Sequence, residues 1–253
     1  MSRMQVFATF LSLWFFLGFT SSATLSADSS RQDDKYLFFF FYKEKNARTA
    51  QSEQIFDRAV QSLNVPVQAL KINVMDPEQR EIIARYAVER APMPMALIVA
   101  PNGAITGGFP YTFTPEQLKN AMVSPTVAHI LKGLQNRKLV FISVQNETTQ
   151  NNEAAMRGIQ EMSHDSRFAN AIESVVVNPA NEQDRGFLTQ FGVNAQSQQA
   201  QTIFLAPPGD KINTYVGATY KEQLVADLQN AASGCCPDGC CPGGCCPGGR
   251  CGK

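Results

Sequence analysis

The chain has 253 residues, and its 22 lysines and arginines balance 22 aspartates and glutamates to a formal net charge of zero. This balance argues against nucleic acid or an anionic membrane surface as a partner, because both attract chains with a net positive charge. Hydrophobic residues make up 44% of the chain and charged residues 17%, which excludes a mostly disordered protein and allows one large domain or two of about 100 residues.

The N-terminal region is typical of a targeting segment followed by a linker. Arg3 precedes an apolar run at 6–19, and small residues follow at 21–23. This order predicts a secretory signal peptide of residues 1–23, with cleavage after residue 27 as a second option. An uncleaved anchor or a core helix is the alternative, but the run is shorter than the roughly 18–20 residues that span a bilayer. We therefore expect a linker at 24–35, no transmembrane segment in the mature chain, and export to the periplasm or the extracellular space.

Strand and helix patterns alternate through residues 36–124. The continuous apolar run 36–42 fits a strand buried on both faces. Apolar residues at helical spacing follow from Ile55 to Leu63, and helix starts are expected at Asp76-Pro77 and at Thr114-Pro115. The further strands are expected at 67–74, 95–100 and 104–107. The predicted order is β-α-β-α-β-β-α.

The same order recurs in residues 125–232, about 100 residues later, after a helix that starts at Ser124-Pro125. Thr219 and Glu222 predict a capping box for its last helix. An ordered series of matches at a similar offset indicates a tandem duplication. The matching segments are strands at 139–144, 172–177 and 202–205, a helix at 154–162, Asn178-Pro179 for Asp76-Pro77, and Glu222-Gln223-Leu224 for Glu116-Gln117-Leu118.

This order of elements resembles the thioredoxin fold over about residues 36–122 and 126–232. Residues 41–45 stand where thioredoxins have the strand end that leads to their redox motif, and Met93-Pro94-Met95 stands where they carry a cis-proline. The resemblance implies a cis peptide bond at Pro94. In the second half, Gln201-Thr202 occupies that position, and no proline is present.

We therefore expect an α/β protein with two tandem thioredoxin-like domains, 36–124 and 125–232. Each should have a central mixed sheet flanked by helices, and a flexible Cys-rich tail should follow at 233–253. Non-catalytic thioredoxin-like domains commonly serve as binding modules. The resemblance therefore implies a protein partner, held in the thioredoxin-like groove or through a tail disulfide.

The thioredoxin redox motif is missing from both halves. Thioredoxins need Cys-x-x-Cys at a helix N-terminus, where the helix dipole and free amides favour the thiolate. The matching positions hold Asn46-Ala47-Arg48-Thr49 in the first half and Gln145-Asn146-Glu147-Thr148 in the second, and residues 1–234 contain no cysteine. We therefore predict that the chain is not a thioredoxin-type enzyme. We interpret residues 46–49 as a helix cap, with a residual binding groove beside Pro94 as the alternative.

Other sources of chemistry are sparse in residues 36–232. His129 and His164 lie in different halves without a His or Cys at metal-ligand spacing, and we interpret both as surface or helix residues. The sequence has no P-loop and no dinucleotide fingerprint, so we expect no obligate cofactor. Asn146-Glu147-Thr148 has the form of a glycosylation sequon.

All cysteines of the chain fall in its C-terminal tail. The tail repeats Cys-Cys-Pro-x-Gly with a period of five residues, and its composition resembles that of metallothionein-like peptides. Thiolates are good ligands for Cu(I) and Zn(II), and glycines let a short chain bring several sulfurs together. The leading hypothesis is therefore a binding protein for a soft metal ion. Its ligands would be Cys235, Cys236, Cys240, Cys241, Cys245, Cys246 and Cys251.

Two other hypotheses use the same cysteines. An exported chain meets an oxidising compartment, where seven thiols would form disulfides and leave one for an intermolecular link. The tail would then anchor a structural or interaction protein to an envelope partner. The third hypothesis is a thiol–disulfide relay in which the tail supplies the thiols and the domains hold the substrate.

Overall fold

The structure is a computed structural model, and it describes residues 35–233. The predicted signal peptide, most of the linker and all seven tail cysteines lie outside the described residues. Within residues 35–233, no helix combines the length and the apolar character that a membrane span requires.

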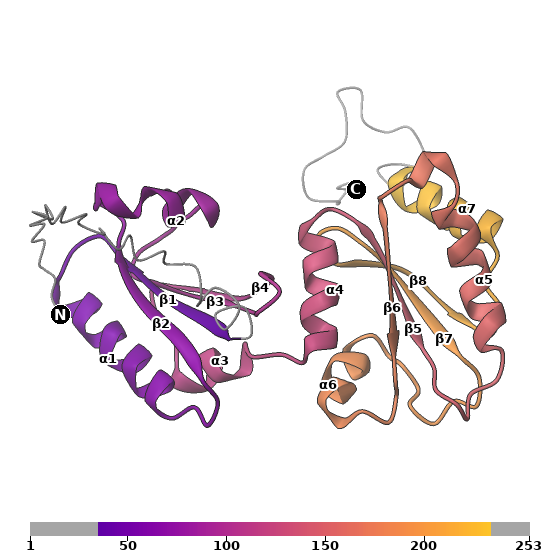
Figure 1. Cartoon of the computed structure of the whole chain (residues 1–253), viewed down its shortest axis with the longest axis horizontal. Helices are drawn as coiled ribbons and strands as arrows, with labels where there is room; N and C mark the ends of the chain where they lie inside the picture. The colour runs from indigo at the N-terminus through magenta and orange to yellow at the C-terminus, as the bar shows by residue number, and fades with distance from the viewer. Residues whose placement is uncertain (1–34, 234–253) are drawn as a thin grey trace, which may run out of the picture. The chain divides into compact units, whose positions relative to one another are not determined.

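The first domain is built on a four-stranded mixed sheet with the strand order β2-β1-β3-β4 (Figure 1). The central strand β1 pairs in parallel with β2 and antiparallel with β3, which pairs antiparallel with β4. The strands are β1 (Tyr36–Tyr42), β2 (Val67–Asn73), β3 (Met95–Val99) and β4 (Ile105–Pro110). The helices are α1 (Ala47–Gln61), α2 (Arg80–Arg85) and α3 (Pro115–Asn120), and a 3₁₀ turn (Pro77–Gln79) precedes α2.

Both faces of this sheet are covered, which explains the continuous apolar run in β1. Phe38 and Phe40 pack with Phe56 of α1 on the face that α1 and α3 cover. Phe39 and Phe41 lie on the opposite face, which α2 covers. Because successive strand residues point to opposite faces, all four phenylalanines are buried.

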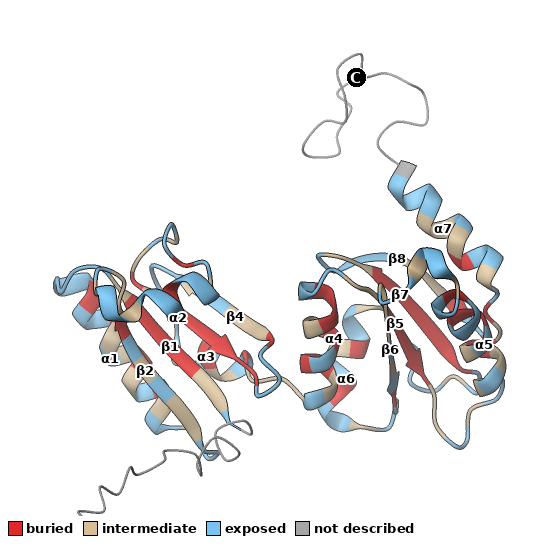
Figure 2. Ribbon diagram, turned by 45° about the horizontal axis from the view of Figure 1, so that its top comes forward, coloured by how far each residue is buried: buried red, intermediate tan, exposed pale blue. Residues whose placement is uncertain are grey.

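The second domain repeats this topology with the strand order β6-β5-β7-β8 and the same parallel and antiparallel pairs. Helices α4 and α6 pack against one face of the sheet, and α5 and α7 pack against the other. Figure 2 shows buried residues following the central strands of both domains. The strands are β5 (Leu139–Val144), β6 (Ile172–Val177), β7 (Gln201–Ala206) and β8 (Asp210–Val216). The helices are α4 (Pro125–Gln135), α5 (Asn152–Ser163), α6 (Glu182–Gln190) and α7 (Lys221–Ser233), with a 3₁₀ turn, η3 (Ser166–Phe168), after α5.

This architecture confirms the predicted α/β fold with two tandem thioredoxin-like domains. Each domain has a β-α-β unit with parallel strands, followed by an antiparallel hairpin and a final helix. Strand β1 lies at the predicted residues, and so do β5 and β6.

The helix that follows the second strand of each domain begins later than the sequence pattern predicts. Asp76 caps only the 3₁₀ turn, where its side chain accepts a hydrogen bond from Glu78 N at 2.9 Å, and α2 starts after that turn. In domain two, the Asn178 side chain accepts from Ala180 N at 2.9 Å and closes a turn. Asn181 then caps α6 by accepting from Gln183 N at 3.1 Å. Asparagine and aspartate favour local turns as well as helix caps, so the dipeptide alone does not fix the helix start.

The predicted capping box of Thr219 and Glu222 is not formed. Helix α7 begins at Lys221, and the buried Thr219 hydroxyl donates instead to the carbonyl oxygen of Ala155 in α5, at 2.7 Å. The chains approach so closely here that a Cβ on Gly158 would lie 2.7 Å from the Thr219 carbonyl carbon. A side-chain contact between helices has therefore replaced the local cap.

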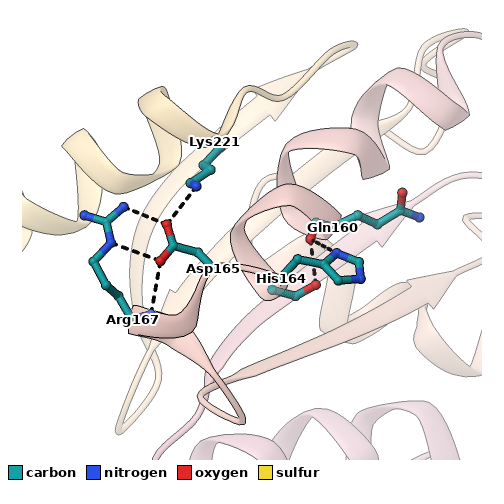
Figure 3. A network of polar contacts seen from close by, with 6 residues as sticks. Gln160, His164, Asp165, Arg167 and Lys221 are labelled. Atoms are coloured by element: carbon teal, nitrogen blue, oxygen red, sulfur yellow. Dashed lines mark hydrogen bonds and ion pairs between the residues drawn. The ribbon is translucent and has the colours of Figure 1, made fainter.

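Asp165 connects the end of α5 to the start of α7 (Figure 3). Its carboxylate accepts hydrogen bonds from Arg167 Nε at 3.1 Å and Nη2 at 2.8 Å, and Lys221 Nζ lies 2.7 Å from Oδ2. The hydrogen bonds from Arg167 and then from Lys221 hold the pKa of Asp165 well below its usual range. The neighbouring His164 ring contacts the carbonyl oxygen of Gln160 at 2.7 Å, as expected for a histidine at a helix end.

We predict that Asp165→Asn lowers resistance to urea at neutral pH. A lowered native-state pKa stabilises the folded protein above the unfolded-state value of about 3.9, and this contribution is lost as the pH falls toward the native value. Equilibrium urea unfolding should therefore give a lower free energy of unfolding for the variant than for wild type at pH 7. This difference should shrink steadily below about pH 4.

The matched control is Glu81→Gln, which breaks an exposed ion pair with Arg85 at 2.9 Å. Its effect should be small at every pH, because exposed pairs contribute little. If Asp165→Asn lowered the free energy of unfolding as much at pH 3 as at pH 7, the Asp165 carboxylate would not be the source of the stabilisation.

Candidate functional site

A cleft with a volume of about 730 Å³ opens in domain one where β1 ends and α1 begins. One wall is the 43–46 loop with the first turn of α1, and the other is the 89–94 segment that leads into β3. The cleft therefore combines the two segments that the sequence singled out, the degenerate redox-motif position and Pro94. A residual binding groove beside Pro94 stays a prediction, for which this cleft offers the space.

Asn46 determines how α1 begins at the cleft. Its backbone is extended, with φ −114° and ψ 178°, and its Oδ1 accepts a hydrogen bond from Thr49 N at 2.9 Å. The Asn46 side chain therefore caps the helix as predicted. Ala47 and Arg48 are exposed, whereas Thr49 is 4% exposed and faces the protein interior.

Pro94 lies on the opposite wall, and the Met93–Pro94 peptide bond is cis. Pro94 itself is buried, and its carbonyl oxygen accepts a hydrogen bond from Tyr111 N at 2.7 Å. Among residues 35–233, none forms a hydrogen bond with the backbone of Pro92 or Met93. The Met93 N–H and the carbonyl groups of Pro92 and Met93 are therefore without hydrogen-bond partners among residues 35–233.

The cleft is lined by apolar side chains and by side chains of both charges. Met75 is 62% exposed, and Met93 is half-buried. No histidine or cysteine of the described chain reaches the cleft, and residues 35–233 contain no group of three potential metal ligands. These groups can bind a ligand by apolar contact, charge pairing and backbone hydrogen bonds. The charged lining residues are Lys43, Glu44, Arg48, Glu89 and Arg90, and the apolar ones include Val74, Met75, Ile83 and Met93.

The corresponding region of domain two is arranged differently. A connection of residues 145–151 joins β5 to α5, where residues 43–46 suffice in domain one. The helix is preceded by Asn151, which has φ 64° and makes no side-chain cap. The match of Gln145–Thr148 to Asn46–Thr49 is therefore wrong, because these residues precede the helix instead of starting it. The offset between the halves changes from 102 at the ends of β1 and β5 to 105 at the starts of α1 and α5, so the strands alone do not locate the counterpart of Asn46, which is Asn151.

The extra residues in domain two form a closed polar loop. The Asn146 carbonyl oxygen accepts from Thr149 Oγ1 at 2.9 Å and from Asn152 Nδ2 at 2.8 Å. The Asn146 side chain accepts from Thr148 N at 2.9 Å and donates to Asn178 Oδ1 at 3.3 Å. The amide nitrogen of the sequon is thus already engaged in the fold.

The remaining predicted residues lie apart from the cleft. His129 is 55% exposed and contacts Glu173 at 2.8 Å, and His164 lies at the end of α5, so neither belongs to a metal cluster among the described residues. The seven tail cysteines lie outside residues 35–233. Sequence reasoning missed Glu89, Arg90 and Met75, which reach the cleft only through the tertiary fold.

Comparison with known proteins identifies structures of the thioredoxin fold. No protein-family model matches the sequence, and no curated protein matches it. The first two thioredoxin domains of Eps1p from Saccharomyces cerevisiae share 11% identity, over 79% of this chain and 93% of that chain, with a TM-score of 0.29.

The same two domains of Eps1p from Naumovozyma dairenensis share 12% identity, over 86% of this chain and 97% of that chain, with a TM-score of 0.28. The thioredoxin Deadhead from Drosophila melanogaster shares 22%, over 36% of this chain and 81% of that chain, with a TM-score of 0.29. The fold assignment depends on strand order and register, which define a chain of two tandem thioredoxin-like domains.

We predict that Asn46→Cys with Thr49→Cys, in a chain whose seven tail cysteines are changed to serine, creates a dithiol that undergoes disulfide exchange. The 2.9 Å bond between Asn46 Oδ1 and Thr49 N places the two positions at the cap and in the first turn of α1. The helix N-terminus should lower the pKa of the thiol introduced by Asn46→Cys below the ordinary cysteine value of about 8.5.

Insulin reduction with dithiothreitol and a pH titration of thiol alkylation measure both effects. The control is Ala47→Cys with Ala50→Cys, which has the same spacing one residue further along the helix. Exchange by the first variant that is no faster than by this control would contradict the match to the redox position.

Proposed function

We propose that this chain is an exported, non-catalytic binding protein whose first domain holds an extended polypeptide segment and whose tail binds a soft metal ion. The observation that carries the first part is the cleft beside Pro94, where the backbone of Pro92 and Met93 has no hydrogen-bond partner among the described residues.

An extended polypeptide fits this cleft better than a small metabolite. Free main-chain groups along one wall can pair with a strand, which is how peptides add to exposed backbone edges. Met75 and Met93 offer adaptable apolar contacts, and thioether side chains accommodate varied partners. Lys43, Glu44 and Arg48 give the opposite wall charges of both signs, which suits a polypeptide with mixed side chains.

The cleft lacks the thiols that thioredoxin-type catalysis needs. Asn46 and Thr49 occupy the positions of the two thiols, and the first cysteine of the chain is Cys235. Amide and hydroxyl groups cannot exchange disulfides, so the domains themselves supply binding and no redox chemistry. This supports a binding role for domain one.

We predict that Met93→Arg weakens polypeptide binding in the cleft. Peptides selected from a phage-displayed library on the full chain should bind this variant at least about tenfold more weakly, equal to about 1.4 kcal/mol, because the arginine adds bulk and charge beside the free backbone. Isothermal titration calorimetry measures the affinities.

The matched control is Val216→Arg, at a position that is 61% exposed in domain two. Selected peptides should bind it as they bind wild type, and N-methylation of one central peptide amide should weaken binding if main-chain pairing holds the peptide. Equal affinity for Met93→Arg and wild type would exclude the cleft as the binding site.

The tail supports the second part of the proposal by its sequence. Six thiols in three Cys-Cys-Pro-x-Gly repeats, together with Cys251 after them, offer more sulfur ligands than one Cu(I) or Zn(II) ion needs. The disulfide-anchored interaction protein and the thiol relay use the same residues, and they remain the alternative functions.

We predict that native mass spectrometry of the exported protein, isolated without reductant or chelator, finds metal adducts that disappear on acidification. A chain with all seven cysteines changed to serine should carry no metal and should retain peptide binding, because the cleft contains no cysteine. The same spectrum gives the cleavage site, after residue 23 or 27.

The disulfide alternative has a different signature. A mass about two daltons lower for each cysteine pair, with no metal and with a covalent dimer or partner adduct, would replace the metal proposal by anchoring. Loss of folding in the all-serine chain would show that the domains depend on the tail.

A further inference from the structure

The strand registers give a residue-by-residue correspondence between the two domains. Met95 begins β3 and Gln201 begins β7, so Pro94 corresponds to Ala200. The hydrogen bonds agree, because Tyr111 N donates to Pro94 O at 2.7 Å and Gly217 N donates to Ala200 O at 2.8 Å. Tyr111 and Gly217 also share left-handed backbone, with φ 64° and 79°.

In domain two the segment that corresponds to Pro92–Pro94 is paired, and one of its bonded groups, the Gln198 carbonyl, is the counterpart of the free Pro92 carbonyl. Gln150 N donates to Gln198 O at 2.7 Å, and Ala200 N donates to Gln150 O at 2.9 Å. These bonds make a parallel bridge between Gln150 and Gln199, the residue that corresponds to Met93. The residue that pairs with this segment, Gln150, belongs to the loop between β5 and α5 of the same domain.

The longer connection between β5 and α5 makes this bridge attainable. Thr149 Oγ1 donates to the Asn146 carbonyl at 2.9 Å and contacts Asn152 Oδ1 at 2.8 Å, which holds the loop against the start of the helix. Asn151, with φ 64°, then turns the chain from the bridge into α5. Thr149 is thus held by side-chain hydrogen bonds, and Asn151 by the turn into α5, on either side of Gln150.

We propose that residues 149–151 form a strap that fills the polypeptide edge of domain two, leaving one open site per chain and a second one latent beneath the strap. This rests on the proposed function of the domain-one cleft. The latent site differs chemically from the open one, because Ala200 has an N–H to donate and Pro94 has none. Once released, it would accept a parallel extended segment through the groups that now bind Gln150.

The first test distinguishes the main-chain hydrogen bonds of the strap from any contribution of the Gln150 side chain. Both bonds are main-chain bonds, so Gln150→Ala should leave them intact, whereas Gln150→Pro removes the N–H that donates to Gln198. Amide hydrogen exchange of Ala200 should be at least about tenfold faster in Gln150→Pro than in wild type and unchanged in Gln150→Ala. Equal exchange in all three proteins would overturn the strap.

The second test opens the latent site in a folded chain. Residues 145–151 are replaced by the four-residue connection of domain one, Lys-Glu-Lys-Asn, and the probe is a synthetic Thr-Thr-Gln-Asn-Asn peptide that copies residues 148–152. NMR titration should shift the amides of residues 198–200 in the shortened chain and leave them unmoved in wild type.

Shifts at 198–200 in wild type, or their absence in a shortened chain whose spectrum is otherwise native, would overturn the proposal. The domain-one site is judged separately by the Met93→Arg experiment. Failure of that experiment would remove the proposed function, whereas failure here would remove only the strap.

Discussion

The structure depends on a central strand in each domain that is buried on both faces. In β1, Phe38 to Phe41 are between 0% and 2% exposed, and they need helices on both sides of the sheet to keep water away. The β-α-β unit and the antiparallel hairpin supply that cover in the same order twice. Packing fixes the strand and its helices relative to one another. The end of β1 therefore lies beside the start of α1, across the cleft from Pro94.

Two domains with one topology present different surfaces at that place. Domain one has a short connection, an asparagine cap and a proline, and together these leave a cleft with an unpaired backbone wall. Domain two has a longer connection whose Gln150 pairs with Gln198 and Ala200, the counterparts of Pro92 and Pro94. The sheets and helices tolerate both arrangements, since the difference lies in loops that carry few core contacts. The two domains thus share a strand order and differ in the loops at this place.

Polar contacts between elements decide details that local patterns suggest wrongly. The Thr219 hydroxyl bonds to α5 instead of capping α7, and Asp165 gathers Arg167 and Lys221 where helices meet. Tyr215 likewise donates to Asp227 of α7 at 2.6 Å, and burial together with this bond raises the pKa of its hydroxyl. These contacts fix the last helix of domain two on its sheet.

The sequence by itself determined the strand and helix order, the duplication, the absence of thiols before the tail and the cap at Asn46, because periodicity, cysteine position and capping are local properties. Only the tertiary structure decided which backbone edge is free, because the pairing of Gln150 with Gln198 and Ala200 joins residues far apart in the chain. The same holds for the cleft, whose Met75 and Arg90 come from segments with no motif of their own. Whether a backbone edge is free depends on which distant segments pack beside it, and a local sequence pattern does not contain that information.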